Sequence, residues 1–152
     1  MEAYKKKRIL SIRGDSSEDA DDLVAVEKRL RISINGRNVL NMYCTPLMIR
    51  ELVAGIIYNE GLIKGEWCAE RISIEYNEEI QADVPSSGEV YEGEYTITSG
   101  CAGGVSSRHE LSGKIISDEI TFTLESLRKI FIEFQKNSEV YKITGCTHSA
   151  AL

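Results

Sequence analysis

One cysteine of this chain lies in a loop of small residues instead of among apolar neighbours. The run Ser99-Gly100-Cys101-Ala102-Gly103-Gly104 follows directly on the strand-like residues Tyr95-Thr96-Ile97. Small neighbours leave a sulfur accessible, and the N–H groups of a glycine-rich turn can stabilise a thiolate. The pattern suits a thiol that meets a second molecule, such as a persulfide carrier that accepts sulfur and hands it on. The alternatives are a redox-sensing thiol and a cysteine that the turn merely tolerates.

The other cysteines and the histidine near the end of the chain offer weaker candidates. Cys44, Cys68 and Cys146 are widely spaced and form no C-x-x-C pair, which is typical of reduced thiols and not of a disulfide framework. Zinc takes about four nitrogen or sulfur ligands. The chain has only two histidines and no pair of closely spaced cysteines, so we expect no metal site. His148 fits an acid/base group, a phosphate contact or a structural hydrogen-bonded side chain equally well.

Composition narrows the class of protein. The 152 residues carry a net charge of −6, with 42% hydrophobic and 28% charged residues, as in an ordinary soluble domain. The acidic balance argues against nucleic-acid binding, and no apolar run approaches the ~18 residues that span a bilayer. The basic residues 1–8 lack the apolar core of a secretory signal, so we expect a cytoplasmic protein with a solvated N-terminal arm. The acidic residues 14–22 predict a solvated loop.

A strand pair is the clearest element of the first half. Apolar residues alternate from Val24 to Ile34, which predicts a strand with one apolar face. Asn35-Gly36 tolerates the positive φ angles of a type I′ turn, and residues 39–44 predict the return strand. Cys44, in that return strand, is expected to be half-buried and structural.

Helices are predicted on both sides of the Cys101 loop. Thr45-Pro46 predicts the start of the first helix, whose apolar stripe begins at Ile49 and stops before Gly61. We expect this helix to lie across the strand pair. Residues 72–76, 77–84 and 90–98 predict further strands. Thr123 predicts the N-cap of a second helix, and Asn137-Ser138 predicts its end or a kink. The apolar stripe of this helix consists of Leu124, Leu127, Ile130, Phe131 and Phe134.

Several phrases, in this order and spacing, resemble the FdhD family of formate dehydrogenase accessory sulfurtransferases. They are Val24-Ala25-Val26-Glu27-Lys28, Ile34-Asn35-Gly36, Cys44-Thr45-Pro46, Glu51-Leu52-Val53-Ala54-Gly55-Ile56, Asn59-Glu60-Gly61, Ser99-Gly100-Cys101-Ala102-Gly103-Gly104 and Thr144-Gly145-Cys146-Thr147-His148-Ser149-Ala150-Ala151-Leu152. The resemblance covers nearly the whole chain from about Asp22 onward.

The resemblance implies a sulfurtransferase activity. Such proteins accept persulfide sulfur from a cysteine desulfurase and pass it to the molybdenum or tungsten bis-pterin guanine dinucleotide cofactor that formate dehydrogenase needs. Cys101 matches the persulfide-bearing cysteine of the family. Gly104 stands where many members carry a second cysteine, which puts an intramolecular relay in doubt. The resemblance places Gly100, Gly103, Gly104, Thr147 and His148 at the cofactor.

The resemblance also implies a fold and partners. We expect an α+β fold, with a small sheet and one packed helix in residues 1–113. Residues 114–152 would then hold the first helix and strand of a truncated cytidine-deaminase-like domain. The implied partners are a cysteine desulfurase, the catalytic subunit of formate dehydrogenase and a second copy in a homodimer. Because the last residues look like the inside of an element, we expect a chain cut at Leu152. The alternative function is a docking module for the desulfurase or the apo-enzyme, without complete transfer chemistry.

Overall fold

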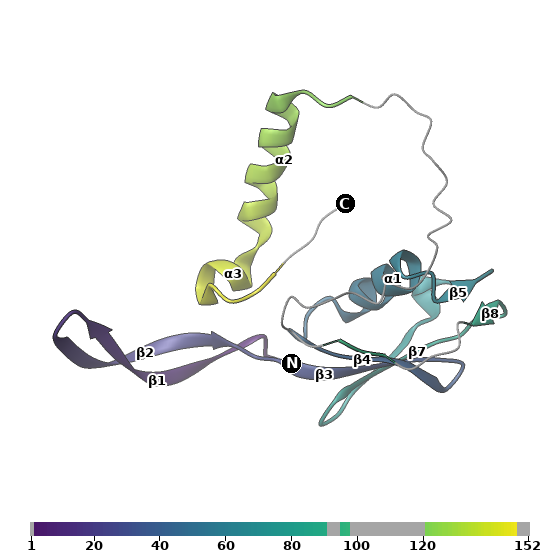
Figure 1. Ribbon diagram of the computed structural model, residues 1–152, viewed down its shortest axis with the longest axis horizontal. Coiled ribbons are helices and arrows are strands. Elements are labelled where there is room, and N and C mark those ends of the chain that lie inside the picture. Colours follow the sequence, from purple (N-terminus) through teal and green to yellow (C-terminus); the bar gives the residue numbers. More distant parts are fainter. Residues whose placement is uncertain (1, 91–94, 98–120, 149–152) are drawn as a thin grey trace. The chain divides into compact units, whose positions relative to one another are not determined.

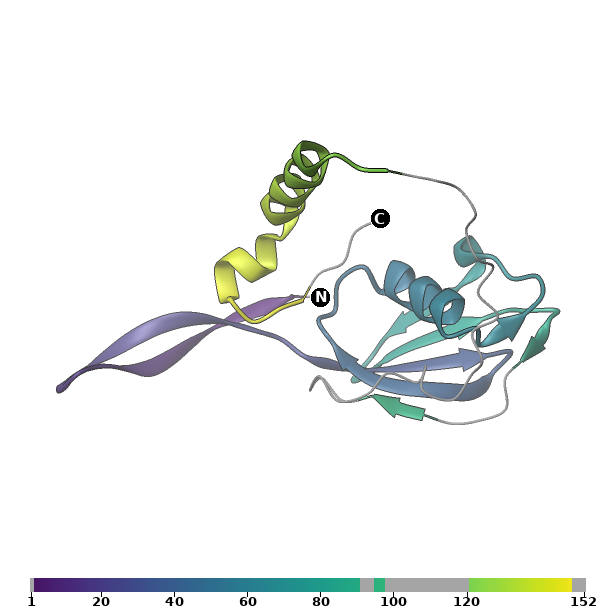
Figure 2. The ribbon, with the colours of Figure 1, turned by 45° about the horizontal axis from the view of Figure 1, so that its top comes forward.

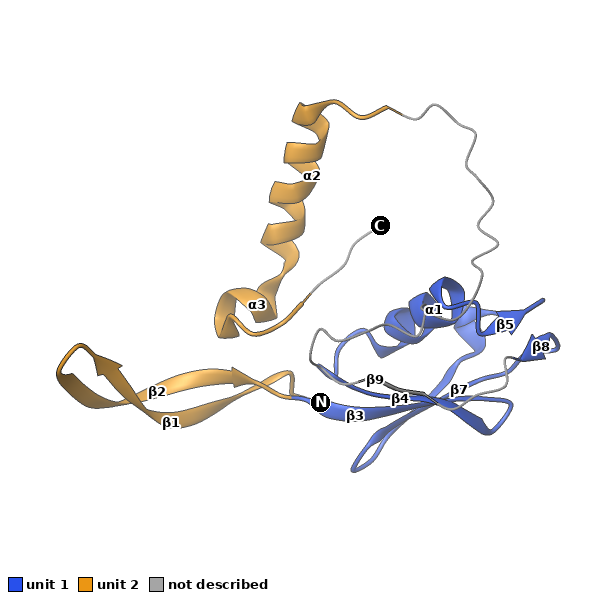
Figure 3. Cartoon of the chain, in the orientation of Figure 1, with its two compact units in different colours: residues 1, 27–112 blue, residues 2–26, 113–152 orange. Residues whose placement is uncertain are grey.

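The chain has a mixed α+β fold that divides into two compact units. The computed structural model describes residues 2–90, 95–97 and 121–148 (Figure 1). One unit comprises residue 1 and residues 27–112, and the other comprises residues 2–26 and 113–152 (Figure 3). The domain boundary near residue 113 stays a prediction. Within the described ranges, no helix is long and apolar enough to cross a membrane.

The first unit is built on a five-stranded sheet with the order β6-β7-β3-β4-β9. The β3–β7 and β4–β9 pairs are parallel, and the β3–β4 and β6–β7 pairs are antiparallel. The strands are β3 (Lys28–Ile34), β4 (Arg37–Cys44), β6 (Ser73–Tyr76), β7 (Ile80–Val84) and β9 (Tyr95–Ile97). A separate short pair joins β5 (Ile63–Lys64) to β8 (Glu89–Val90).

The turn between β3 and β4 confirms the prediction from its sequence. Asn35 and Gly36 both have positive φ angles, 50° and 77°, as a type I′ turn requires. The pattern did not reveal a β-bulge close to this turn. Ile32 pairs with Leu40 but Ser33 pairs with Asn38, so Val39 has no partner in the register. The bulge explains why Val39 and Leu40 are both buried although they are adjacent in a strand.

Helix α1 (Ile49–Asn59) covers one face of this sheet (Figure 2). Its predicted stripe is confirmed, because Ile49, Val53 and Ile57 are buried in the core. The predicted start at Thr45-Pro46 is wrong: Leu47 N–H donates to Thr45 O at 2.8 Å, and this tight turn delays the helix until after Met48.

The end of α1 is a Schellman motif, as the position of Gly61 predicts. Gly61 has a φ of 60°, and its N–H donates to Tyr58 O at 3.4 Å. Leu62 N–H donates to Ile57 O at 3.1 Å, so these carbonyl groups at the helix end have partners.

The core lies between α1 and the sheet. Leu30, Ile32 and Ile34 of β3 point into it, which confirms the predicted apolar face of this strand. The alternate residues of β3 lie on the other face of the sheet, which α1 does not cover. The remaining buried side chains come from every layer of the unit: Val39, Leu40, Ile49, Val53, Ile57, Leu62, Ile63, Ile72, Ile80, Ala82 and Val84.

The second unit begins with a long hairpin that corrects two predictions. β1 (Tyr4–Arg13) pairs antiparallel with β2 (Ser16–Ala25), so the basic segment is not a solvated arm and the acidic segment is not a loop. Opposite charges face each other across the two strands and contribute to this pairing. Lys6 Nζ lies 2.8 Å from Asp21 Oδ2, and Arg8 Nη2 lies 3.0 Å from Asp19 Oδ2. The predicted single strand from Val24 to Ile34 is therefore two strands, which separate after Ala25.

Two helices complete the described part of the second unit. α2 (Leu124–Asn137) starts at the predicted cap, where Thr123 Oγ1 accepts a hydrogen bond from Ser126 N–H at 3.1 Å. The predicted break at Asn137-Ser138 is confirmed, and α3 (Glu139–Thr144) follows. No strand follows α2 within residues 121–148, and the cytidine-deaminase-like character of this unit stays a prediction.

Candidate functional site

The predicted sulfur-bearing loop lies outside the described residues. Cys101, Gly100, Gly103 and Gly104 all belong to residues 98–120. The strand expected before them is confirmed for Tyr95–Ile97, where Ile97 lies beside Met42 of β4 in a parallel pair. The chain therefore enters this segment from a terminal strand of the sheet. Two residues beyond Met42, β4 reaches Cys44.

Cys44 is a half-buried strand thiol, as its sequence context predicts. It packs against the core, and burial raises its pKa to about 11, with a smaller contribution from the nearby Glu27 carboxylate. The thiolate is the nucleophilic form of cysteine, and this thiol is almost entirely protonated at neutral pH. Cys44 is therefore a poor candidate for sulfur transfer.

Cys68 is held by a local hydrogen bond. Its Sγ–H donates to Glu70 Oε2 at 2.7 Å, and this bond is the main reason that the pKa of the Glu70 carboxyl is lowered. The surrounding turn, η1 (Ala69–Arg71), is fastened to α1 by Arg50. Arg50 Nη1 donates to the carbonyl oxygens of Ala69 at 2.8 Å, Glu70 at 3.1 Å and Ile72 at 2.7 Å. The thiol is thus carried on a well-anchored turn.

The predicted cofactor contacts at the end of the chain follow α3. Thr147 is half-buried and His148 is exposed. Just before them, Cys146 is an exposed thiol whose Sγ–H donates to Thr144 O at 3.0 Å. The described residues do not bring Thr147 or His148 together with Cys101 or its glycines, because that loop lies outside them. Their cofactor role stays a prediction.

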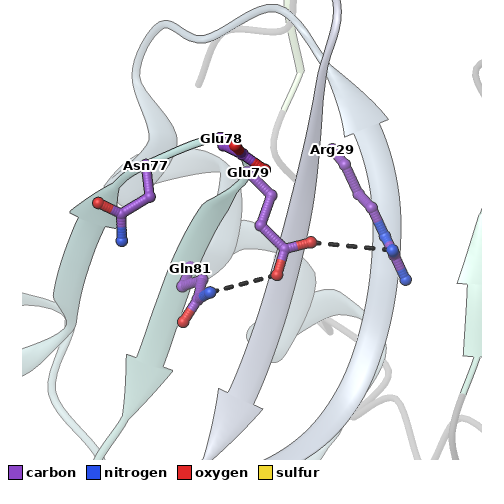
Figure 4. A pocket seen from close by; sticks show the side chains of 5 residues that line it. All are labelled: Arg29, Asn77, Glu78, Glu79 and Gln81. Atoms are coloured by element: carbon purple, nitrogen blue, oxygen red, sulfur yellow. Dashed lines mark hydrogen bonds and ion pairs between the residues drawn. The ribbon is translucent and has the colours of Figure 1, made fainter.

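An open hollow lies beside the turn between β6 and β7 (Figure 4). Its volume is about 460 Å³, and Arg29, Asn77, Glu78, Glu79 and Gln81 line it. Glu79 is the centre of a polar network, because its carboxylate accepts from Gln81 Nε2 at 3.2 Å and lies 3.8 Å from Arg29 Nη1. No thiol lines this hollow, so it is not a candidate for sulfur chemistry.

A second hollow contains a thiol that the sequence pattern did not single out. It has a volume of about 550 Å³, and its lining includes Trp67, Cys68, Arg71, Ser86 and Ser87. The sequence predicts only a connecting loop for Trp67 and Cys68. Ser86 comes from the loop between β7 and β8, so no local pattern could have shown that these residues meet.

The Asn35 side chain joins the strand turn to this second hollow. Asn35 Nδ2 donates to Ser86 O at 2.8 Å, and Ser86 N–H donates back to Asn35 Oδ1 at 3.0 Å. Gly36 N–H donates to Asp83 Oδ1 at 2.7 Å. The Ile34-Asn35-Gly36 phrase thus connects two segments about fifty residues apart in sequence. Its role in the described structure is architectural.

Metal binding is not indicated by the described residues. Among residues 2–90, 95–97 and 121–148, no three histidine, cysteine, aspartate or glutamate side chains form a group that could hold a metal ion.

Comparisons with known proteins identify the family. The fold is an α+β domain that leads through a sheet strand into a cysteine-bearing segment. The FdhD/NarQ family model matches residues 25–152, and the chain belongs to this family. This finding confirms the resemblance drawn from the short phrases.

The matches to individual relatives cover most of this chain but little more than half of each relative. The sulfur carrier protein FdhD of Bacillus licheniformis is 28% identical over 141 residues, covering 87% of this chain and 53% of the relative. The protein of the same name from Sulfolobus acidocaldarius is 28% identical and covers 97% of this chain and 58% of its own length.

A solved structure supports the fold. The crystal structure of a putative formate dehydrogenase accessory protein from Desulfotalea psychrophila has a TM-score of 0.50 and 24% identity. The match covers 60% of this chain and 38% of that one.

Proposed function

We propose that this chain is a sulfur carrier in which Cys101 bears the transferred sulfur. The observation that carries the proposal is membership of the FdhD/NarQ family over residues 25–152, together with relatives named sulfur carrier protein FdhD. The position of Cys101 in a glycine-rich loop supports it, because such a loop suits a thiolate that must meet two partners in turn.

The loading step is a thiol exchange with a cysteine desulfurase. The Cys101 thiolate attacks the outer sulfur of the desulfurase's cysteine persulfide, and the bond between the two persulfide sulfurs breaks. The desulfurase cysteine leaves as a thiolate, and Cys101 then holds the sulfur as its own persulfide. No net oxidation occurs in this step.

The acceptor of the sulfur is the bis-pterin guanine dinucleotide cofactor of formate dehydrogenase, with molybdenum or tungsten. The cofactor is a substrate here, and we assign its contacts to Gly100, Gly103, Gly104, Thr147 and His148. Delivery of the sulfur as a sulfide ligand consumes two electrons, which we assign to an external thiol reductant. The protein acts as a cytoplasmic homodimer in this scheme.

Comparison with the three other cysteines supports the assignment of the transferred sulfur to Cys101. Cys44 is protonated because burial raises its pKa to about 11. The Cys68 thiol already donates a hydrogen bond to Glu70 Oε2 at 2.7 Å. Cys146 donates to Thr144 O at 3.0 Å and is exposed, which makes it the informative competitor in a loading assay.

Persulfide loading tests the proposal directly. The full chain is incubated with a cysteine desulfurase and cysteine, and peptide mass spectrometry locates the added sulfur. We expect one sulfur on Cys101, no loading of Cys101→Ala, and normal loading of the matched variants Cys68→Ala and Cys146→Ala. Equal loading of Cys101→Ala and the unaltered chain would show that the assignment is wrong.

A docking module for the desulfurase or the apo-enzyme is the second candidate. The observation that favours it is length, since the chain spans 53% and 58% of two of the curated relatives that it matches. Retained binding of the desulfurase in a pull-down, with no sulfur on any cysteine, would favour docking over carriage.

A further inference from the structure

The hollow around Trp67 and Cys68 has the size of a binding site for a small molecule. Its volume is about 550 Å³, and ligand pockets typically measure roughly 300–1,000 Å³. One wall comes from residues 65–71 and the other from residues 85–87, with Asn35 between them. All of these residues belong to the first unit, so a single compact body forms the whole hollow.

Hydrogen bonds and a close backbone approach hold the two walls together. Ser86 Oγ donates to Glu66 O at 3.3 Å and accepts from Gly88 N–H at 2.9 Å. The Asn35 side chain bonds both the N–H and the carbonyl group of Ser86. A Cβ at position 88 would collide with Lys64 O, so glycine is needed where the two segments meet. The hollow is therefore preformed, and a ligand does not have to order its walls.

Three hydrogen-bond donors of the lining are not used by this frame. They are the Arg71 guanidinium, the Trp67 indole N–H and the Ser87 hydroxyl, which have no side-chain partner among the residues that the structure describes. The Cys68 thiol, in contrast, already donates to Glu70 Oε2. The hollow thus offers several donors, one of them charged, to a ligand that accepts hydrogen bonds.

The charges and rings of the lining favour a carboxylate with an apolar body. A guanidinium such as that of Arg71 can bind a carboxylate through two parallel N–H···O bonds. Glu66 also lines the hollow, and its negative charge disfavours a phosphate dianion more strongly than a singly charged carboxylate. The rings of Trp67 and Pro85 provide apolar surface for the remainder of the ligand.

We propose that the hollow between residues 65–71 and 85–87 binds a small organic carboxylate. Arg71 holds the carboxylate group, and the apolar body of the ligand lies against Trp67 and Pro85. The Ser87 hydroxyl and the Trp67 indole N–H supply further hydrogen bonds to its oxygens. The inference does not depend on which cysteine carries sulfur.

Trp67 fluorescence tests the proposal in the full chain, because Trp67 is the only tryptophan and lines the hollow. Benzoate is the probe, acetate is the comparison without the ring, and benzyl alcohol is the comparison without the charge. We expect a saturable change with benzoate, at an affinity at least about tenfold higher than for either comparison compound. Benzoate should also slow the alkylation of Cys68 by iodoacetamide and leave that of Cys146 unchanged.

Two outcomes of these titrations would overturn the proposal. The first is the absence of a saturable fluorescence change together with unaltered alkylation of Cys68 in the presence of benzoate. The second is tighter binding of phenyl phosphate than of benzoate, because the proposal assigns the hollow to a carboxylate and not to a phosphate.

Paired variants locate the binding in the hollow. Arg71→Gln is expected to weaken benzoate binding at least about tenfold, because it removes the charged donor. Glu66→Gln is expected to strengthen it by about two- to threefold, because it removes a like charge. Both side chains are exposed, and urea denaturation checks that both variants fold.

Arg29→Gln is the matched control for Arg71→Gln. It removes the same charge from the same unit, but Arg29 lines the other hollow, so the affinity for benzoate should change by less than about twofold. Equal weakening by Arg29→Gln and Arg71→Gln would trace the binding to net charge and overturn the proposal. Weaker binding by Glu66→Gln would also overturn it, because the ligand would then need an acceptor at Glu66.

Discussion

The half-buried thiol of Cys44 allows a quantitative test of how burial controls cysteine reactivity in this protein. Burial and the Glu27 carboxylate raise the pKa of its thiol to about 11, against about 8.5 for an unperturbed cysteine. At pH 8 the thiolate fraction of Cys44 is then about one in a thousand, whereas an unperturbed thiol is about one quarter thiolate. The difference lowers the concentration of the reactive form by roughly 200-fold.

The greater nucleophilicity of a thiolate with a high pKa offsets part of this roughly 200-fold difference in thiolate concentration. A thiolate of higher pKa is a better nucleophile, and a Brønsted coefficient of about 0.4–0.5 returns roughly tenfold. We therefore expect native Cys44 to react with iodoacetamide at least about 20-fold more slowly than a thiol of ordinary pKa, before steric protection by the core is counted. The rate should keep rising with pH up to about 11.

Pulsed alkylation with peptide mass spectrometry measures these rates in one sample. Cys146 serves as the internal reference because it is exposed. Unfolding in denaturant should bring Cys44 close to the rate of Cys146, since burial is the main cause of the raised pKa. Equal rates for the two thiols in the native protein at pH 8 would show that burial does not raise the pKa of Cys44.

The same pKa shift predicts how stability depends on alkaline pH. The folded pKa of Cys44 is raised, so the folded state keeps a proton that the unfolded chain has lost. Its contribution to the free energy of unfolding is therefore complete below about pH 8.5 and disappears as pH rises toward about 11. Denaturant titrations across this range should show a smaller decline in Cys44→Ala.

Three glycine substitutions and one pair of glutamate substitutions give further predictions. Gly36→Ala should lower the free energy of unfolding by about 1–2 kcal/mol, because φ is +77° there. Gly88→Ala should cost about 1–3 kcal/mol, because its Cβ would lie 2.4 Å from Lys64 O. Gly55→Ala should raise stability by about 0.5–1 kcal/mol, since it is helical with open space around it. In α1, Glu51→Gln should destabilise by about 0.3–1 kcal/mol because Glu51 lies in the first turn, whereas Glu60→Gln at the C-cap should stabilise by a similar amount.

All five substitutions lie in the first structural unit, which also contains Trp67. Urea denaturation followed by Trp67 fluorescence therefore measures the free energy of unfolding of each variant. Gly55→Ala is the control for the other two glycines, and a loss of stability there would contradict the geometry of α1. The two glutamates control each other, because the same change at opposite helix ends must act with opposite sign. Destabilisation by Glu60→Gln would contradict the effect expected from the helix dipole.

Local patterns predicted much of the first unit correctly. The alternation in β3, the Asn35-Gly36 turn and the stripe of α1 all appear in the structure because each depends on residues only a few positions apart. The start of α1 was predicted wrongly, since Thr45-Pro46 has the chemistry of a helix start but forms a preceding turn. The β-bulge at Val39 also left no signal in the alternation.

Long-range pairing could not be predicted in the same way. The basic segment and the acidic segment each look solvated when taken alone, but they pair as the β1–β2 hairpin, in which opposite charges meet across the strands. The hollow around Cys68 is similar, because Ser86 reaches it from a separate loop. Each depends on which distant residues become neighbours, and composition over a short window does not contain that information.

The amino-acid sequence alone was enough to recognise the family and to single out Cys101, because the phrases that carry the resemblance are local and ordered along the chain. The burial of the described thiols and the exposure of the α2 stripe became known only from the packing of the chain. Cys44 is expected to react slowly because it is half-buried against the core, and the α2 stripe is exposed among the described residues. Both properties arise from burial, which is set by the packing of segments far apart in the chain.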